Sequence, residues 1–127
     1  MQERQVCLAL LLVAAILLGQ GCKTTVIGPE GQTVATYRLG KLSAEEPKDI
    51  NAVYQATLQA LTELELSISQ KLKDELTAKV IARDSQDTRI AVNLLATTKD
   101  STNVSIHAGS YARASRVYQA IHKSLQQ

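Results

Sequence analysis

The chain has 127 residues, a hydrophobic content of 45% and a formal net charge of +2 at pH 7. A chain of this length builds a single domain. Its 14 basic and 12 acidic residues are too evenly mixed for the clustered basic stripe of a nucleic-acid-binding protein. The aromatic residues are four Tyr, with no Phe or Trp, so the core is expected to consist of Leu, Ile, Val and Ala.

The first 21 residues have the pattern of a secretory signal peptide. A polar start with Arg4 is followed by a continuous apolar run, Val6 to Leu18. This run is too short for a transmembrane helix, which needs about 20 apolar residues, and small residues suited to a peptidase follow it. The sequence therefore predicts export of the chain and removal of residues 1–21.

The stretch LLGQGC, Leu17 to Cys22, resembles the lipobox of bacterial lipoproteins, whose cysteine is diacylated and becomes the first residue after cleavage. Gly21 matches the small residue that a lipobox requires before the cysteine. Cys7 would be lost with the signal peptide, so Cys22 would be the only cysteine of the mature chain and no intramolecular disulfide could form. Cys22 is therefore the predicted lipidation site.

The resemblance to lipoproteins implies a location in the cell envelope. In Gram-negative lipoproteins an Asp after the acylated cysteine retains the protein in the inner membrane, and this chain has Lys23 there. The expected location is the periplasmic face of the outer membrane. Residues 22–32, which contain Gly28-Pro29 and Gly31, are expected to form a flexible tether to a domain over residues 33–127.

Residue patterns in this domain begin with a strand and a helix. Thr33–Leu42 has the composition of a strand, in which Gly40 suggests a bulge or a close backbone approach. Ser43–Pro47 is expected to be a turn. Pro47–Leu64 has apolar residues three and four positions apart, which predicts an amphipathic helix. Ser110 is expected to cap a second such helix near the end of the chain.

Between the helices, four segments alternate apolar and polar residues with a period of two, which is typical of strands with one wet face. In the first of them Leu66 and Ile68, with Leu72 as a third candidate, share the apolar face. The segments are Leu66–Leu72, Leu76–Asp84, Thr88–Ala96 and Thr102–Ala108. The predicted class is α+β: a single antiparallel sheet of about five strands with two helices packed on one face, in the order β-α-β-β-β-β-α.

Segments along the whole domain resemble a known family. They are YRLGKL, AVYQATLQALTELELSIS, LTAKVIARD, TRIAVNL and NVSIHAGSYARASRVYQAI. Across roughly Ala35 to Ile121 the chain resembles the domain-of-unknown-function family 3568, small lipoproteins of Gram-negative bacteria with no established activity. In that family a glycine usually follows the first helix, where this chain has Glu65. The resemblance supports the envelope location and the fold, and it implies no chemistry.

The sequence contains no reactive constellation, so neither an enzyme nor a cofactor is predicted. Two histidines on different elements are too few ligands for a metal site. A Ser–His–Asp set lacks the strained turn of a nucleophile elbow, and paired carboxylates fall at helix ends and a hairpin tip, where solvated charges are usual. The candidate metal ligands are His107 and His122, and the candidate Ser–His–Asp set is Ser110, His107 and Asp100. The candidate paired carboxylates are Asp49, Glu63, Glu65 and Asp74-Glu75.

The outward positions of the predicted sheet carry basic side chains, and one tyrosine is expected to be partly exposed. Such a surface suits anionic headgroups, peptidoglycan carboxylates or a partner protein, although an ordinary solvated face has similar residues. The surface consists of Arg38, Lys79, Arg83, Arg89, His107 and Tyr111. The sequence thus indicates a non-catalytic, lipid-anchored periplasmic module that docks to another envelope component. A carrier of a small apolar ligand held between helices and sheet is the alternative, and a wall-modifying enzyme is a third hypothesis.

Overall fold

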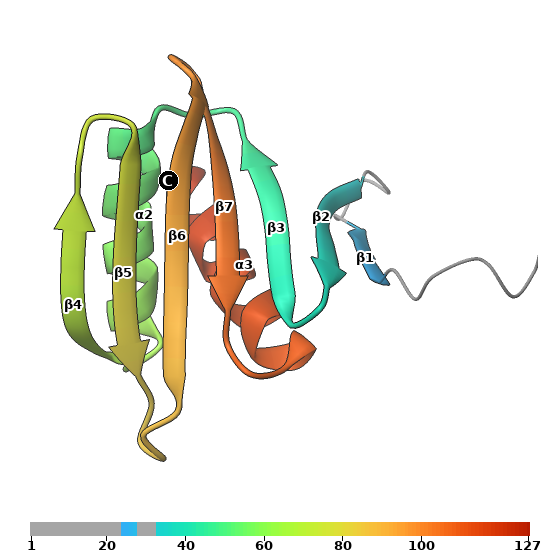
Figure 1. Cartoon of the computed structure of the whole chain (residues 1–127), viewed down its shortest axis with the longest axis vertical. Helices are drawn as coiled ribbons and strands as arrows, with labels where there is room; N and C mark the ends of the chain where they lie inside the picture. The colour runs from blue at the N-terminus through green and yellow to red at the C-terminus, as the bar shows by residue number, and fades with distance from the viewer. Residues whose placement is uncertain (1–23, 28–32) are drawn as a thin grey trace, which may run out of the picture.

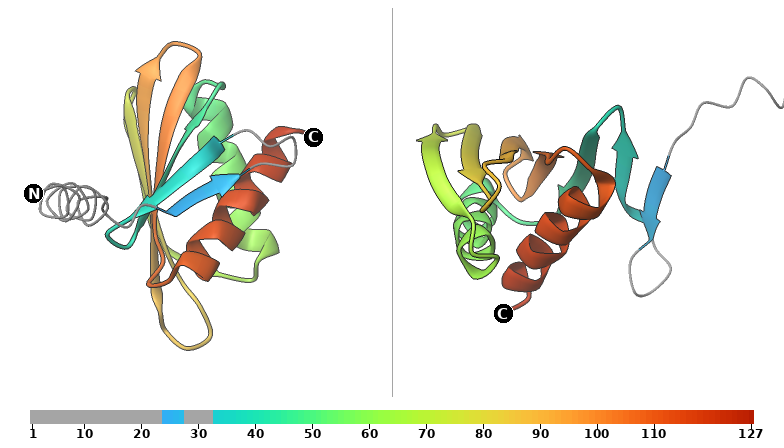
Figure 2. Two further views of the ribbon diagram at one scale, coloured as in Figure 1. Left: turned by 90° about the vertical axis from the view of Figure 1, so that its right-hand side faces the viewer. Right: turned by 90° about the horizontal axis from the view of Figure 1, so that it is seen from below.

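The computed structural model describes residues 24–27 and 33–127, so the predicted signal peptide and Cys22 lie outside the described residues. In this part of the chain one antiparallel sheet has the strand order β1-β2-β3-β7-β6-β5-β4. Two helices lie on one face of the sheet (Figure 1), as the edge-on view in Figure 2 also shows. The strands are β1 (Thr24–Ile27), β2 (Thr33–Arg38), β3 (Lys41–Glu46), β4 (Ser67–Lys73), β5 (Thr77–Arg83), β6 (Arg89–Thr98) and β7 (Ser101–His107), and the helices are α2 (Ile50–Glu63) and α3 (Tyr111–Leu125). The predicted α+β class is confirmed.

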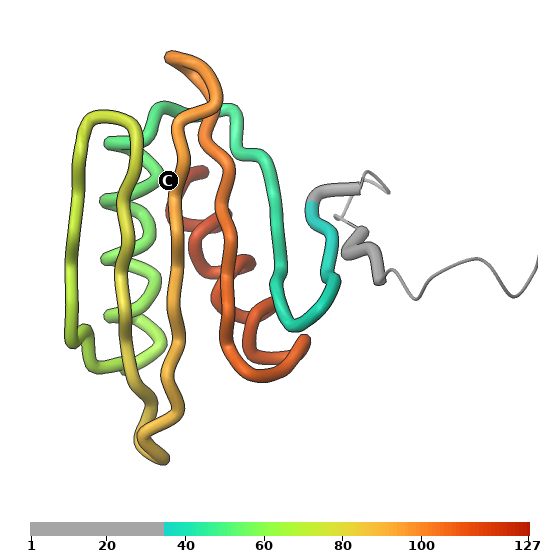
Figure 3. Tube along the Cα trace, viewed as in Figure 1, coloured from blue at the N-terminus to red at the C-terminus, as the bar shows by residue number. Residues whose placement is uncertain are grey.

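The segment expected to be one strand over Thr33–Leu42 is a hairpin of β2 and β3. Leu39 and Gly40 form the turn with φ of 52° and 77°, and Arg38 pairs with Lys41 across it. Positive φ at both central residues gives a two-residue turn whose twist matches that of the flanking strands. The expectation of a bulge at Gly40 was wrong, because the chain reverses there (Figure 3).

Two further segments near the N-terminus differ from the prediction. Ser43 to Glu46, expected to be a turn, belongs to β3 and pairs with β7. Thr24–Ile27, inside the expected tether, is strand β1 and pairs with β2. Its β-branched residues favour a strand. The sheet therefore has seven strands instead of about five.

Helix α2 begins at Ile50 instead of in the predicted Pro47 turn, because Asp49 is its N-cap and accepts a hydrogen bond from the backbone N–H of Asn51 at 3.2 Å. At its end, the Leu66 N–H bonds to the Leu61 carbonyl and the Glu65 N–H to that of Thr62, each at 3.0 Å. This is a Schellman motif, and Glu65 occupies its left-handed position with a φ of 60°.

The core lies between the helices and the sheet. Helix α2 packs on β4, β5 and β6, α3 packs on β3 and β7, and the two helices pack on each other. The largest fully buried apolar side chains are aliphatic, as the composition predicts: Leu42, Val53, Leu61, Val80, Val92, Val104, Ile106 and Ile121. The predicted cap of α3 is confirmed, since the Ser110 hydroxyl accepts from the Arg113 N–H at 3.3 Å. None of the described helices is long and apolar enough to cross a membrane.

Strand β4 contains a bulge between Ile68 and Gln70. Because a bulge adds one residue, it moves the side chains beyond it to the other face. Leu72, a candidate for the apolar face, therefore lies opposite Lys79 on the side away from the helices and is 55% exposed.

Candidate functional site

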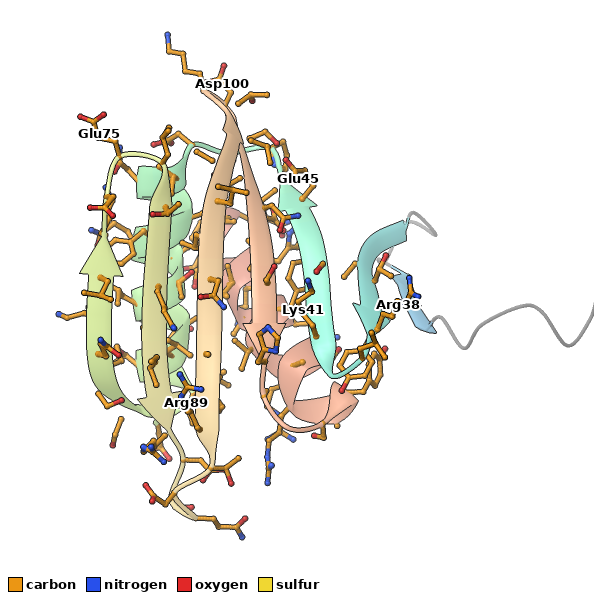
Figure 4. The ribbon with its side chains drawn as sticks, viewed as in Figure 1. Arg38, Lys41, Glu45, Glu75, Arg89 and Asp100 are labelled. Carbon is orange, nitrogen blue, oxygen red and sulfur yellow. The ribbon has the colours of Figure 1, made fainter. Side chains whose placement is uncertain are left out.

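The face of the sheet away from α2 and α3, hereafter the open face, is turned toward the viewer in Figure 4. The residues that alternate with buried Leu42, Val80, Val92 and Ile106 point to this face, since successive side chains of a strand lie on opposite sides. Of the predicted surface residues, the structure brings all but Tyr111 to the open face. They are Arg38, Lys79, Arg83, Arg89 and His107.

Three cationic or titratable side chains stand side by side across β2, β3 and β7. Arg38 is the cross-strand partner of Lys41, and Lys41 is the partner of His107. All three side chains are exposed. Like charges directly opposite each other destabilise a sheet, so folding gains nothing from the Arg38–Lys41 pair. Such a pair is stabilised when an anionic partner binds.

A second like-charged pair lies near the other edge of the open face. Arg83 of β5 is directly opposite Arg89 of β6. The Arg83 Nη1 donates a hydrogen bond to the Asp87 carbonyl at 3.0 Å and lies 3.5 Å from that residue's carboxylate. Arg89 is exposed and makes no ion pair with the described residues. It is the side chain of this pair best placed to meet an external anion.

A cleft of about 560 Å³ on the open face, lined in part by Lys41, combines apolar and polar side chains. Leu72 and Leu95, which are 55% and 51% exposed, supply its apolar surface. Its full lining is Lys41, Leu72, Asp74, Thr77, Ala78, Lys79, Asn93, Leu94, Leu95, Asn103 and Ser105. Exposed leucines bordered by polar side chains match the apolar centre and polar rim of a protein–protein contact.

The acidic residues of the open face gather at the opposite end of the strands. In Figure 4, Glu45, Glu75 and Asp100 lie at the end remote from Arg38 and Lys41. Glu45 accepts hydrogen bonds from the hydroxyls of Ser101, at 2.5 Å, and Thr97, and from the Asn103 amide at 3.3 Å. These bonds, that of Ser101 first, hold the pKa of Glu45 below its usual value. Glu45, Glu75 and Asp100 thus lie toward one end of the strands, whereas Arg38 and Lys41 lie toward the other (Figure 4).

Tyr111, the remaining predicted surface residue, lies on the other side of the sheet. It is the first residue of α3 and packs edge-to-face on Tyr37, with ring centroids 5.3 Å apart. Tyr37 and Arg38 are successive in β2, so their side chains point to opposite faces. Tyr111 therefore borders the corner of the molecule formed by the β2–β3 turn and the start of α3.

Sequence reasoning missed two exposed residues at this corner, Leu39 and Lys41. Both were hidden in a segment interpreted as one strand. Leu39 is 92% exposed at the tip of the turn. The signal that could have found them is the Leu39-Gly40 pair, because a glycine between two strand-like halves also indicates a hairpin.

A buried polar cluster also escaped prediction. Glu46, at the inward-facing end of β3, is 3% exposed. Its Oε1 accepts a hydrogen bond from the Tyr118 hydroxyl at 2.7 Å and lies 3.1 Å from His122 Nδ1. Burial and the Glu46 carboxylate raise the pKa of Tyr118 well above its usual range. His122, one of the two candidate metal ligands in the sequence, is half-buried here, and the cluster joins α3 to the sheet.

A smaller cleft of about 370 Å³ opens where α2 ends and α3 begins. The Asp84 carboxylate there accepts from the backbone N–H groups of Thr88 and Gln86, which lower its pKa, and lies 3.8 Å from Arg113 Nε. The cleft is lined by Leu64, Glu65, Leu66, Asp84, Ser85, Ile90, Arg113, Arg116 and Val117. Within residues 24–27 and 33–127, no three or more His, Cys, Asp or Glu side chains are grouped to hold a metal ion.

Comparison with known proteins gives a family and no function. Residues 5–127 match the family described as protein of unknown function (DUF3568). Among curated proteins, none matches the chain.

Proposed function

Because the chain belongs to the DUF3568 family, whose function is unknown, we propose its role from the site alone: a lipid-anchored, non-catalytic module of the cell envelope. Acylated Cys22 would hold the domain at the periplasmic face of the outer membrane, and the open face would dock against an anionic envelope component. That component is the acidic surface of a protein or the carboxylates of peptidoglycan.

The observation that carries this proposal is the composition of the open face. It keeps two like-charged cross-strand pairs, Arg38–Lys41 and Arg83–Arg89, together with a cleft that has two exposed leucines. Neither feature benefits the isolated domain. The two cations within each pair repel each other, and the two leucines are exposed to water. The Arg83–Arg89 pair and the two leucines become favourable when an acidic partner with an apolar centre covers the face.

The carrier hypothesis has less support. It requires an apolar space between helices and sheet, where the side chains of Leu42, Leu61 and Ile106 pack with no exposed area. The cleft at the junction of α2 and α3 has Asp84 and Arg113 in its wall, which suits a polar ligand better than an apolar one. A measurement of small-molecule release on denaturation of the purified native protein would revive the hypothesis if an apolar ligand appeared.

The anchor is tested by intact mass spectrometry of the protein extracted from its native membrane. The expected chain begins at Cys22 and carries the added mass of acyl groups. Cys22→Ser should retain the signal peptide or release an unmodified chain. A native chain that retains residues 1–21, or that has an unmodified thiol, would contradict the proposal.

Docking is tested by site-specific photocrosslinking in the native envelope. A photoreactive amino acid at Asn93, in the cleft of the open face, should give one reproducible crosslinked product, and the same group at Gln55, on the exposed side of α2, should not. Digestion with a protease or a muramidase then separates a protein partner from peptidoglycan. Arg83→Glu together with Arg89→Glu should abolish the product. Equal crosslinking from Asn93 and Gln55 would refute docking by the open face.

A further inference from the structure

The turn between β2 and β3 presents an apolar tip between two cations. Leu39 is 92% exposed and has a φ of 52°, a conformation that a leucine adopts only at a cost. Its neighbours Arg38 and Lys41 are exposed, and neither makes an ion pair with the described residues. A strained, exposed leucine flanked by basic residues is unfavourable in water and favourable at a lipid surface.

Two residues beside the turn, Tyr111 and His107, also suit a lipid surface. Tyr111 is 39% exposed at the start of α3 and packs on Tyr37 beside the turn. His107, at the end of β7, is the cross-strand neighbour of Lys41. Tyrosine side chains are favoured at membrane interfaces, where the ring lies in the apolar layer and the hydroxyl in the headgroups. We define the membrane corner as Arg38, Leu39, Lys41, His107 and Tyr111.

The chain enters the described structure beside this corner. Thr24, the first residue of β1, is the cross-strand partner of Tyr37, which precedes Arg38. Position 22 is two residues earlier, and two residues span at most about 7 Å. An acylated Cys22 would thus keep this end of the sheet at the bilayer, while the β6–β7 turn with Asp100 lies at the opposite end (Figure 4).

We infer that the membrane corner rests on the lipid surface, with Leu39 inserted at the boundary of the acyl chains and Arg38 and Lys41 at the lipid phosphates. The inference rests on the proposed acylation of Cys22. It adds an orientation: the Arg38–Lys41 pair meets lipid, and the end of the sheet with Glu45 and Asp100 (Figure 4) points away from the bilayer. Arg83, Arg89 and the cleft of the open face remain accessible to a partner.

The test uses the full acylated chain reconstituted in vesicles of phosphatidylethanolamine and phosphatidylglycerol. The mature chain would have no second cysteine, so Leu39→Cys carries a single polarity-sensitive fluorophore, and Lys99→Cys places the same probe in the β6–β7 turn. The probe at position 39 should shift its emission to shorter wavelength and be quenched by lipids with a quencher on the acyl chain. The probe at position 99 should remain as in water.

A matched pair of double variants separates the corner from net charge. Arg38→Gln with Lys41→Gln should weaken the contact of the membrane corner with the lipid surface. The equilibrium constant between the lipid-bound and the water-exposed corner should fall about fivefold for each cation removed. Arg83→Gln with Arg89→Gln removes the same charge from the same face and should leave the signal at position 39 unchanged.

Two outcomes overturn the inference: an acylated chain whose probe at position 39 stays in water, or an equal loss of signal in both double variants. A purified chain without the acyl mass instead overturns the proposed function, so the two failures are distinguished by mass spectrometry of the same sample.

Discussion

Glu65 has a backbone conformation that lowers the stability of the domain. The Schellman motif at the end of α2 requires a left-handed residue, and Glu65 has a φ of 60° there. Glycine adopts this conformation without the steric cost that any L-side chain has. The position coincides with the glycine that the resemblance to family 3568 places after the first helix.

We therefore expect Glu65→Gly to stabilise the domain by about 1 kcal/mol. Glu63→Gly, two residues earlier in the last turn of α2, should destabilise it by about 1 kcal/mol, because a glycine inside a helix loses more entropy. Urea unfolding followed by circular dichroism measures both changes. A loss of stability in Glu65→Gly would show that its side chain makes a contact more valuable than the backbone relief.

Leu39 also has a left-handed backbone conformation, in the turn between β2 and β3 instead of at a helix end. Leu39→Asn should raise the free energy of unfolding by about 0.5–1 kcal/mol, since asparagine tolerates the left-handed region. The same change removes the apolar tip, so the variant should be more stable and dock less on anionic vesicles. Thermal unfolding and the vesicle assay measure the two effects, and a variant that gains stability and keeps full docking would contradict a role for Leu39 in lipid contact.

At the scale of elements, Glu46 decides how α3 sits on the sheet. Glu45 and Glu46 are adjacent in β3 and point to opposite faces: Glu45 is exposed, whereas Glu46 is buried between β3 and α3. The bonds of Glu46 to Tyr118 and His122 join residues more than 70 positions apart in the chain. Glu45 is therefore a control for substitutions at Glu46.

Glu46→Ala should lower the free energy of unfolding by about 3 kcal/mol, because it leaves Tyr118 and His122 without their acceptor. Glu45→Ala should change it by about 0.5 kcal/mol or less, as expected for an exposed position. Chemical denaturation of the two variants gives the comparison, and similar losses in both would refute a structural role for the buried carboxylate.

The raised pKa of Tyr118 predicts how stability depends on alkaline pH. Above about pH 10, the usual tyrosine pKa, the unfolded chain releases the Tyr118 proton while the folded chain retains it. The stability that this tyrosine contributes is therefore complete below pH 10 and is lost as the pH rises further. Tyr118→Phe should be less stable by about 2 kcal/mol at pH 7 but should show a flatter decline above pH 10. Tyr54→Phe keeps Tyr118 and should retain the decline; an unchanged slope in Tyr118→Phe would disprove the assignment.

At the scale of the whole molecule, one face of the sheet is covered by the helices, and the other is the face that we propose for docking. The two helices lie on the first face (Figure 2) and bury aliphatic side chains against it. The open face keeps like-charged pairs that folding alone would not favour. Stability and binding should therefore respond in opposite directions to the same substitution.

Arg89→Glu tests this separation. The new carboxylate would lie opposite Arg83 and form a cross-strand ion pair worth about 0.5 kcal/mol, so the melting temperature should rise slightly. Crosslinking from Asn93 in the envelope should fall, because the open face loses positive charge. Arg116→Glu, on the exposed side of α3, is the control for net charge and should leave crosslinking unchanged. If Arg89→Glu lowered stability and kept crosslinking, the open face would have no role in docking.

Parts of this architecture could be predicted because their causes are local. The apolar stripes of α2 and α3, the alternation in β5, β6 and β7 and the Ser110 cap each depend on residues within a few positions of one another. The places of Leu39 and Lys41 in the membrane corner and the Glu46 cluster could not be predicted, since Lys41 was assigned to the interior of one strand and Glu46 to a turn. Each acquires its role from partners in distant segments, His107 and Tyr118 respectively.

By itself, the sequence determined the α+β class, the order of the main elements, the aliphatic core and the prediction that Cys22 is acylated. Only the tertiary structure decided that β2 and β3 form a hairpin, that the β4 bulge turns Leu72 to the open face and that Glu46 is buried under α3. The reason is that residue periodicity selects the type of an element, whereas strand register and the face that a side chain occupies depend on which distant strand or helix packs against it.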